Sequence, residues 1–106
     1  METPDKWVIL KLGDEPIYKV FATWMGGYLG GDAWKINSGI TKIEEEGDFY
    51  LFHGYSGSVY KCRKEAYGTS GYSQGILKNI LEQVKKIGSV EVMPKETKWF
   101  ELNFDY

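Results

Sequence analysis

The chain has 106 residues, one cysteine, 42% hydrophobic residues and a net charge of −2 at pH 7. The hydrophobic content excludes a disordered chain, and the single cysteine excludes a disulfide within the chain. Without an excess of Lys and Arg to neutralise phosphates, general nucleic-acid binding is not expected.

The same features set expectations for domain organisation and location. A chain of this length predicts a single domain over residues 1–106, with residues 1–5 as a flexible N-terminal tail. The longest apolar run, residues 7–10, is too short to span a membrane. The N-terminal segment has neither a basic start nor an apolar stretch of signal-peptide length. We therefore expect a cytoplasmic protein that does not enter the membrane.

The first two thirds of the chain are predicted to form β-strands. Apolar and aromatic runs bounded by turn residues predict strands at residues 7–12, 17–25, 34–44, 49–55 and 58–63. Asn37, Ser38 and Gly39 interrupt the third run, which indicates either a bulge or an amide directed into a site. A short turn at residues 56–57 would pair His53 with Tyr60.

The last third contains the main helix signal, over residues 73–87. Its apolar residues recur at helical spacing: Ile76, Leu77, Ile80, Leu81, Val84 and Ile87. Thr69, Ser70 or Ser73 is expected to cap the start, and Gly88 to adopt a left-handed conformation after the end. Two further strands are predicted at residues 90–93 and 99–104. The fold class is therefore α+β: a curled antiparallel sheet of five to seven strands with one main α-helix packed on it.

The residue inventory favours a protein that is not an enzyme. One histidine and one cysteine are too few for a typical zinc site, and no phosphate-binding or dinucleotide motif is present, so no metal or cofactor is expected. The predicted turn places His53 and Cys62 diagonally on one strand face, where core packing is the favoured interpretation and nucleophilic catalysis the alternative. A small enzyme with a Cys/His or carboxylate site therefore stays an open alternative.

Three glycine- and tyrosine-containing loops stand out, at residues 26–32, 54–58 and 67–75. Glycine allows backbone N–H groups to approach a ligand closely, and tyrosine offers a flat face with a polar tip. The third loop leads into the helix, whose N-terminus favours an anionic group. Together the loops indicate a pocket for a small planar anion, although turn chemistry alone also explains their composition.

The leading hypothesis is a non-catalytic binding protein that holds or sequesters a small polar or anionic, possibly nucleotide-like, ligand. The candidate ligand-binding residues are Tyr28 and Trp34 for stacking, Ser56, Ser58, Thr69 and Ser70 for hydrogen bonding, and Lys35, Lys61 and Arg63 for charge. Trp24 and Trp99 are expected to be structural.

A second hypothesis is a protein–protein interaction module, either an adaptor or an inhibitor. Exposed aromatic side chains are common anchors of such interfaces, and the candidates here are Tyr28, Trp34, Tyr55 and Tyr72. Self-association through uncovered edge strands is a further option.

Overall fold

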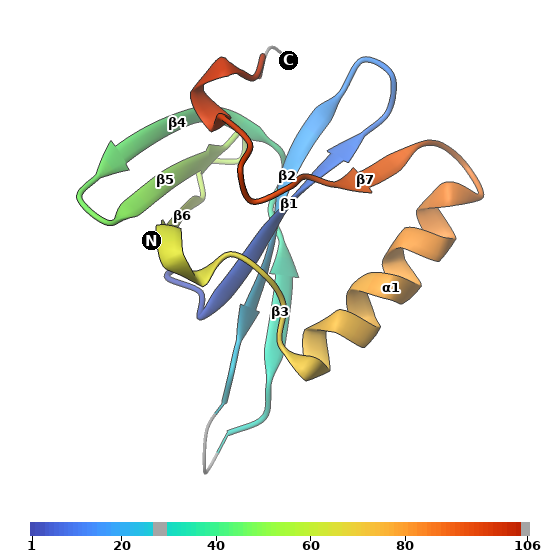
Figure 1. Ribbon diagram of the computed structural model, residues 1–106, viewed down its shortest axis with the longest axis horizontal. Helices are drawn as coiled ribbons and strands as arrows, with labels where there is room; N and C mark the ends of the chain where they lie inside the picture. Colours follow the sequence, from blue (N-terminus) through green and yellow to red (C-terminus); the bar gives the residue numbers. More distant parts are fainter. Residues whose placement is uncertain (27–29, 105–106) are drawn as a thin grey trace.

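The computed structural model describes residues 1–26 and 30–104, which form seven strands, one α-helix and two short 3-10 helices (Figure 1). Four strands form an antiparallel sheet in the order β3-β2-β1-β7: β1 (Lys6–Leu12), β2 (Ile17–Trp24), β3 (Ala33–Ile36) and β7 (Val90–Val92). The second antiparallel sheet contains β4 (Ile40–Glu46), β5 (Phe49–Gly54) and β6 (Val59–Arg63). The α+β class with one main helix, α1 (Gly71–Lys85), is confirmed, and the strands are divided between two sheets.

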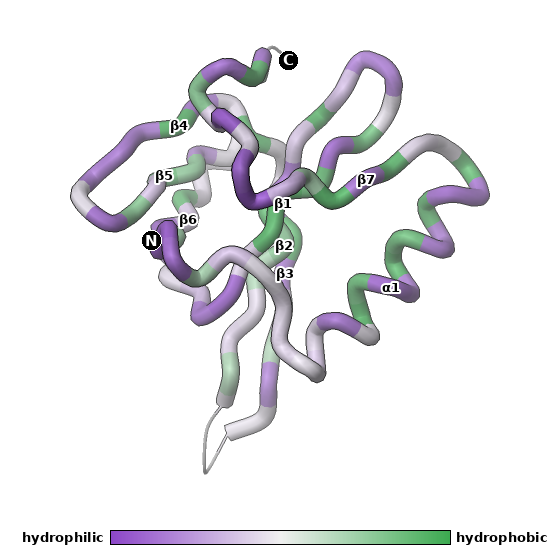
Figure 2. Tube along the Cα trace, in the orientation of Figure 1, coloured by the Kyte–Doolittle hydropathy of each residue, from purple (hydrophilic) through white to green (hydrophobic). Residues whose placement is uncertain are grey.

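The four-stranded sheet lies between α1 and the three-stranded sheet. Because successive side chains of a strand point to opposite faces, β1 contributes to two hydrophobic clusters. Trp7 and Ile9 pack with the three-stranded sheet, whereas Val8 and Leu10 pack with Leu77 of α1. Figure 2 shows the resulting concentration of hydrophobic residues where β1 and β2 cross the middle of the molecule. The continuous apolar run of β1 is thus explained by burial on both faces.

The larger cluster is mainly aromatic and lies between the two sheets. Its buried members are Trp7, Ile9, Tyr18, Val20, Ala22, Ile40, Phe52, Tyr60, Cys62 and Trp99. Burying one large apolar side chain contributes about 1.5–3 kcal/mol, so this cluster is a main source of stability. Trp99 is 4% exposed. It belongs to η2 (Trp99–Glu101), a 3-10 helix, so the strand predicted at residues 99–104 is wrong.

The third predicted strand is split at Asn37, where the chain leaves one sheet for the other. Asn37 N–H donates to the Val20 carbonyl (3.0 Å), and Gly39 has a positive φ of 128° that suits only glycine well. Residue 40 then pairs with Gly54 in the three-stranded sheet. The small polar residues therefore mark a crossover between sheets.

The β5–β6 connection differs from the predicted turn by one residue. Gly54 and Ser58 close the loop, since Gly54 N–H donates to the Ser58 carbonyl (2.8 Å), and Gly57 has a φ of 96°. His53 therefore pairs with Val59, and Cys62 pairs with Tyr50. A shift of one residue reverses the faces, so the predicted placement of His53 and Cys62 on a shared face is wrong.

The helix begins as the capping residues predict and ends differently. Ser70 is the N-cap: its hydroxyl accepts from Ser73 N–H (3.1 Å), and Ser73 Oγ accepts from Ser70 N–H (2.9 Å). This reciprocal pair is a capping box. Gly88 is not among the glycines with positive φ, and its N–H donates to the Val84 carbonyl (3.0 Å). The prediction of a left-handed Gly88 is therefore wrong.

The N-terminal segment, for which the sequence predicts a tail, makes backbone contacts with both sheets. Glu2 lies beside β6, where its N–H donates to the Val59 carbonyl and its carbonyl accepts from Lys61 N–H. Asp5 N–H donates to the Thr23 carbonyl at the end of β2. The first residues therefore cover part of the β6 edge.

Over residues 1–26 and 30–104, no helix combines the length and the apolar character that a bilayer crossing requires.

Candidate functional site

The structure places Trp34 and Lys35 on opposite faces of β3. The Trp34 ring stacks on Phe21 on the helix side of the sheet, with ring centroids 5.7 Å apart, and is 39% exposed. The Lys35 ammonium pairs with the Glu2 carboxylate (2.9 Å) and lies over the Trp24 ring. Tyr28, the other predicted stacking residue, lies outside the described residues.

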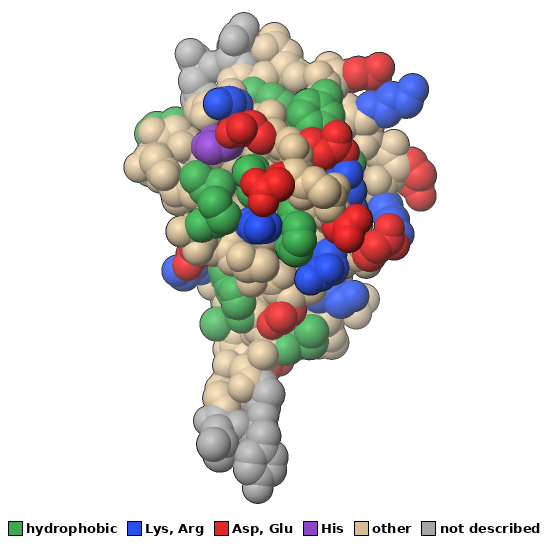
Figure 3. Space-filling view, turned by 90° about the vertical axis from the view of Figure 1, so that its left-hand side faces the viewer, with side chains coloured by type: hydrophobic (Ala, Val, Ile, Leu, Met, Phe, Trp, Pro, Cys, Tyr) green, Lys and Arg blue, Asp and Glu red, His purple; other side chains and the backbone are tan. Residues whose placement is uncertain are grey.

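Lys61 and Arg63 lie on the outer face of the three-stranded sheet, the face turned to the viewer in Figure 3. Both cations sit over the Phe49 ring, at 4.6 and 4.8 Å from its centroid. Lys61 also pairs with Glu46 (3.4 Å). Figure 3 shows basic, acidic and hydrophobic side chains interleaved over this face.

The four predicted hydroxyl residues occupy two places. The hydroxyls of Ser56 and Ser58 lie 3.5 Å apart in the β5–β6 loop. Thr69 and Ser70 precede α1, and the Ser70 hydroxyl is used by the helix cap. Gly68 N–H donates to the Trp7 carbonyl, which places this segment on the β7 side of β1. The predicted site residues thus lie in separate groups: β3, the outer face, the β5–β6 loop and the start of the helix.

A cavity of about 180 Å³ opens between η1 (Lys64–Ala66) and η2, and four of its seven lining residues are aromatic. The lining residues are Trp7, Tyr50, Lys64, Glu65, Tyr67, Lys95 and Trp99. We call this cavity the aromatic pocket. Two larger hollows, of about 390 and 370 Å³, flank the β1–β2 turn. Their linings contain no aromatic side chain in the first case and Tyr18 alone in the second.

The rings of the aromatic pocket are packed against one another. Trp7 and Tyr67 meet edge to face, with centroids 4.7 Å apart at 85°. Trp99 lies 5.7 Å from Tyr67 and 6.0 Å from Trp7, and Tyr50 lies 6.2 Å from Trp7. Such contacts restrict ring rotation, so the pocket walls are held in place before any ligand arrives.

The polar ends of the buried rings are already hydrogen bonded. Trp7 Nε1 donates to the Arg63 carbonyl (2.7 Å). The Tyr67 hydroxyl accepts from Ile9 N–H (3.1 Å) and donates to the Met93 carbonyl. Burial raises the pKa of Tyr67 to about 12, so the phenol stays neutral near pH 7. The polar atoms of Trp7 and Tyr67 are therefore already paired, and Trp7 is almost fully covered by its neighbours.

Charge at the pocket comes from two lysines and one glutamate. The Lys64 ammonium lies 5.0 Å from the Tyr50 ring centroid and pairs with Glu45, and this hydrogen bond raises the pKa of Lys64. Lys95 is exposed and has no ion-pair partner in the described part of the chain. With Glu65 as the single acid of the lining, the pocket residues carry one net positive charge.

The sequence interpretation missed this pocket because its residues come from four separate segments. Tyr50 and Lys64 belong to no recognisable sequence motif, and Trp99 was expected to have only a structural role. Tyr67 belongs to the third glycine-rich loop, and it is the one point where the loop pattern and the pocket coincide.

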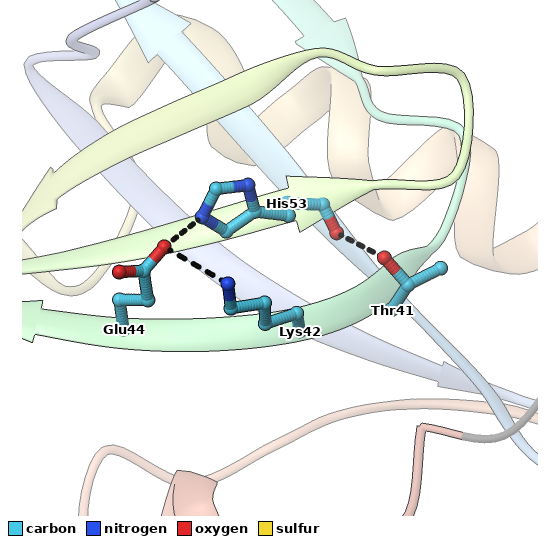
Figure 4. A network of polar contacts seen from close by, with 4 residues as sticks. All are labelled: Thr41, Lys42, Glu44 and His53. Atoms are coloured by element: carbon cyan, nitrogen blue, oxygen red, sulfur yellow. Dashed lines mark hydrogen bonds and ion pairs between the residues drawn. The ribbon is translucent and has the colours of Figure 1, made fainter.

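The polar network around His53 occupies the outer face of the three-stranded sheet (Figure 4). His53 Nε2 lies 2.7 Å from a Glu44 carboxylate oxygen that also pairs with Lys42 (3.5 Å). The hydrogen bond from His53, followed by the charge of Lys42, lowers the pKa of Glu44. Within residues 1–26 and 30–104, no group of three or more His, Cys, Asp or Glu side chains is arranged to hold a metal.

Cys62 lies on the inner face of the same sheet, with no exposed surface, and burial raises the pKa of its thiol. His53 and Cys62 thus point to opposite faces, and no Cys–His pair forms. Cys62 is instead a buried member of the larger hydrophobic cluster.

The fold and pocket define a small α+β protein with a preformed aromatic cavity. Comparisons of the chain with protein-family models, with curated proteins and with solved structures found no match.

Proposed function

We propose that the protein is a non-catalytic binding protein that holds or sequesters a small planar anion in the aromatic pocket. The observation that carries this proposal is the placement of four rings, Trp7, Tyr50, Tyr67 and Trp99, around one cavity with Lys95 at its edge. Aromatic walls bury a flat molecule at small entropic cost, because the rings are already fixed.

The size of the pocket limits the ligand. Sites for drug-sized molecules usually measure about 300–1,000 Å³, whereas the aromatic pocket measures about 180 Å³. The pocket therefore holds one ring system, and the rest of a larger ligand extends into solvent. A nucleotide belongs to this class if its base enters the pocket and its phosphate stays outside.

Lys95 is the residue that selects for negative charge in this proposal. Lys64 already pairs with Glu45, so a ligand anion has to compete with that carboxylate. Lys95 has no such competitor in the described part of the chain, and an anionic group beside it forms a new ion pair at the pocket. Glu65 disfavours ligands that carry a second anionic group on its side of the pocket.

The proposal is tested by tryptophan fluorescence and calorimetry with matched charged and neutral ligands. The pairs are indole-3-carboxylate with indole, and adenosine monophosphate with adenosine. We expect at least one anion to bind more tightly than its neutral partner and Lys95→Ala to weaken that binding about tenfold, equivalent to ~1.4 kcal/mol. Lys78→Ala, which removes an exposed lysine on α1, is the matched control and should bind as the wild type does.

Two results would refute this assignment. The first is saturable binding that Lys95→Ala and Tyr50→Ala leave unchanged, because the ligand would then lie elsewhere. The second is equal affinity for each anion and its neutral partner, because Lys95 would then have no role. We also propose a cytoplasmic location, with which the free, buried thiol of Cys62 is consistent, because the cytoplasm is reducing.

A protein–protein interaction module is the second candidate function, and the position of Trp34 favours it. Trp34 is 39% exposed on β3, an edge strand, and its stacking on Phe21 fixes the ring. Fixed and exposed aromatic side chains are typical anchors of interfaces. This function predicts a stoichiometric protein partner that Trp34→Ala releases and Lys95→Ala retains.

A further inference from the structure

Three polar atoms from two segments of the chain surround the position where a side chain of Gly54 would begin. A Cβ atom on Gly54 would lie 2.7 Å from Ser38 Oγ, 3.0 Å from Ser58 Oγ and 3.6 Å from Asn37 Nδ2. Gly54 itself is buried. We call this group, formed by Asn37, Ser38, Gly54 and Ser58, the Gly54 cradle.

The orientation of the Asn37 amide is fixed by its other hydrogen bond. Asn37 Oδ1 accepts from Val20 N–H (2.9 Å), so the NH₂ group must lie on the opposite side of the amide. Asn37 is 3% exposed, and its Nδ2 has no hydrogen-bond partner among residues 1–26 and 30–104. A buried donor without an acceptor costs about 1–3 kcal/mol, and native proteins rarely leave one unpaired.

The hydroxyl groups of the cradle add further donors. Ser38 Oγ accepts from Ser56 N–H (3.2 Å), which leaves the Ser38 hydroxyl hydrogen available. The Ser56 and Ser58 hydroxyls lie 3.5 Å apart, so one of them donates to the other and one hydrogen remains. Asn37 Nδ2 and the Ser38 hydroxyl hydrogen are thus donors that face the same small region beside Gly54.

We propose that the Gly54 cradle binds one oxygen of a small oxyanion, a carboxylate or a phosphate, through Asn37 Nδ2 and the hydroxyls of Ser38 and Ser58. An oxyanion oxygen accepts several hydrogen bonds at once, which suits a place where an unpaired amide donor and two hydroxyls lie close together. A Cβ at Gly54 would crowd Ser38 Oγ and Ser58 Oγ, so glycine allows these hydroxyls to lie beside Asn37 Nδ2. The site shares no residue with the aromatic pocket and does not depend on the proposed function.

The test is a titration with sodium acetate and with sodium phosphate, followed by NMR of the Asn37 side-chain NH₂ and the Ser58 amide. Sodium chloride at equal ionic strength is the reference. We expect saturable shifts with acetate or phosphate that chloride does not cause; the two arms identify the preferred anion. Ser38→Ala combined with Ser58→Ala should weaken this binding at least tenfold, and Ser89→Ala, an exposed serine, should not.

Gly54→Ala gives an independent test by filling the cradle. Gly54 does not have a positive φ, so alanine is compatible with its backbone conformation. We expect this variant to lose the acetate and phosphate shifts, and the double serine variant covers the case in which Gly54→Ala does not fold. Three outcomes would each overturn the proposal. The first is equal shifts in chloride, and the second is shifts that persist in the double serine variant. The third is a crystal structure in which the cradle holds an ordered water only, which neither anion displaces. Lys95→Ala should leave these shifts unchanged, which separates this site from the aromatic pocket.

Discussion

Asn37 and Val20 are joined by two hydrogen bonds that continue the β2–β3 ladder beyond the end of β3. Asn37 N–H donates to the Val20 carbonyl (3.0 Å), and Val20 N–H donates to Asn37 Oδ1 (2.9 Å). The side-chain oxygen thus replaces a backbone carbonyl at the point where the chain turns toward β4. Because both partners are buried, this pair holds the two sheets in their relative positions.

Asn37→Ala is expected to lower the free energy of unfolding by about 1–3 kcal/mol, because it leaves the buried Val20 N–H without an acceptor. Urea denaturation measures the change. Asn79→Ala, at an exposed position of α1, is the matched control and should stay within about 0.5 kcal/mol of the wild type. Equal stability of the two variants would show that the Asn37 side chain does not hold the crossover.

Much of the fold follows from local patterns in the sequence, and the exceptions have identifiable causes. Strand and helix positions were predictable because the apolar residues of β1, β2 and α1 recur at the periods of strands and helices. The crossover at Asn37 was not, because a bulge and a change of sheet look the same in one sequence. The β5–β6 register depends on a three-residue loop that ends with Gly57 in a left-handed conformation, and one residue of loop length reverses both faces.

The aromatic pocket could not be predicted in the same way. Its rings come from β1, β5, the segment before α1 and η2, and no sequence spacing connects these segments. The glycine-rich loops were visible in the sequence, but their positions in space depend on the sheet order. Only Tyr67 belongs both to a predicted loop and to the pocket.

Cys62 is expected to resist alkylation while the protein is folded. It has no exposed surface, and the raised pKa of its thiol keeps the reactive thiolate scarce near neutral pH. Labelling with iodoacetamide, followed by mass spectrometry, should therefore proceed at the rate of global unfolding. The same reagent in denaturant gives the rate of a free cysteine, and an equal rate in native buffer would contradict the buried position.

Glu44 is expected to titrate below the usual range of a glutamate, because His53 and then Lys42 stabilise its ionised form. A carboxyl whose pKa is lower in the folded state stabilises the protein above the unfolded pKa of about 4.5, and this stabilisation is lost as the pH falls through the lower folded value. Carbon-detected NMR titration of the Glu44 carboxyl measures the shift directly. His53→Ala should raise the pKa of Glu44 more than Lys42→Ala does, and the reverse order would show that the ion pair with Lys42 dominates.

Tyr67→Phe tests the link between β1 and the segment that follows β7. The substitution keeps the ring of the aromatic pocket but removes the hydroxyl that joins Ile9 N–H to the Met93 carbonyl. We expect the free energy of unfolding to fall by about 1–3 kcal/mol, because two backbone groups lose their partner. Tyr72→Phe, at an exposed position of α1, should have little effect in the same urea experiment.

Alkaline conditions should destabilise the protein through the same residue. Burial raises the pKa of Tyr67 from 10.0 to about 12; the hydrogen bond from Ile9 opposes this increase and the charge of Glu96 adds to it. Burial also raises the pKa of Tyr60. Stability is therefore complete below pH 10, where both states keep the phenol neutral, and is lost as the pH rises toward 12. Urea denaturation at a series of pH values in this window should show a shallower loss for Tyr67→Phe than for the wild type. The loss should remain above zero in that variant because Tyr60 still titrates, and parallel curves for the two proteins would show that Tyr67 ionises equally easily in both states.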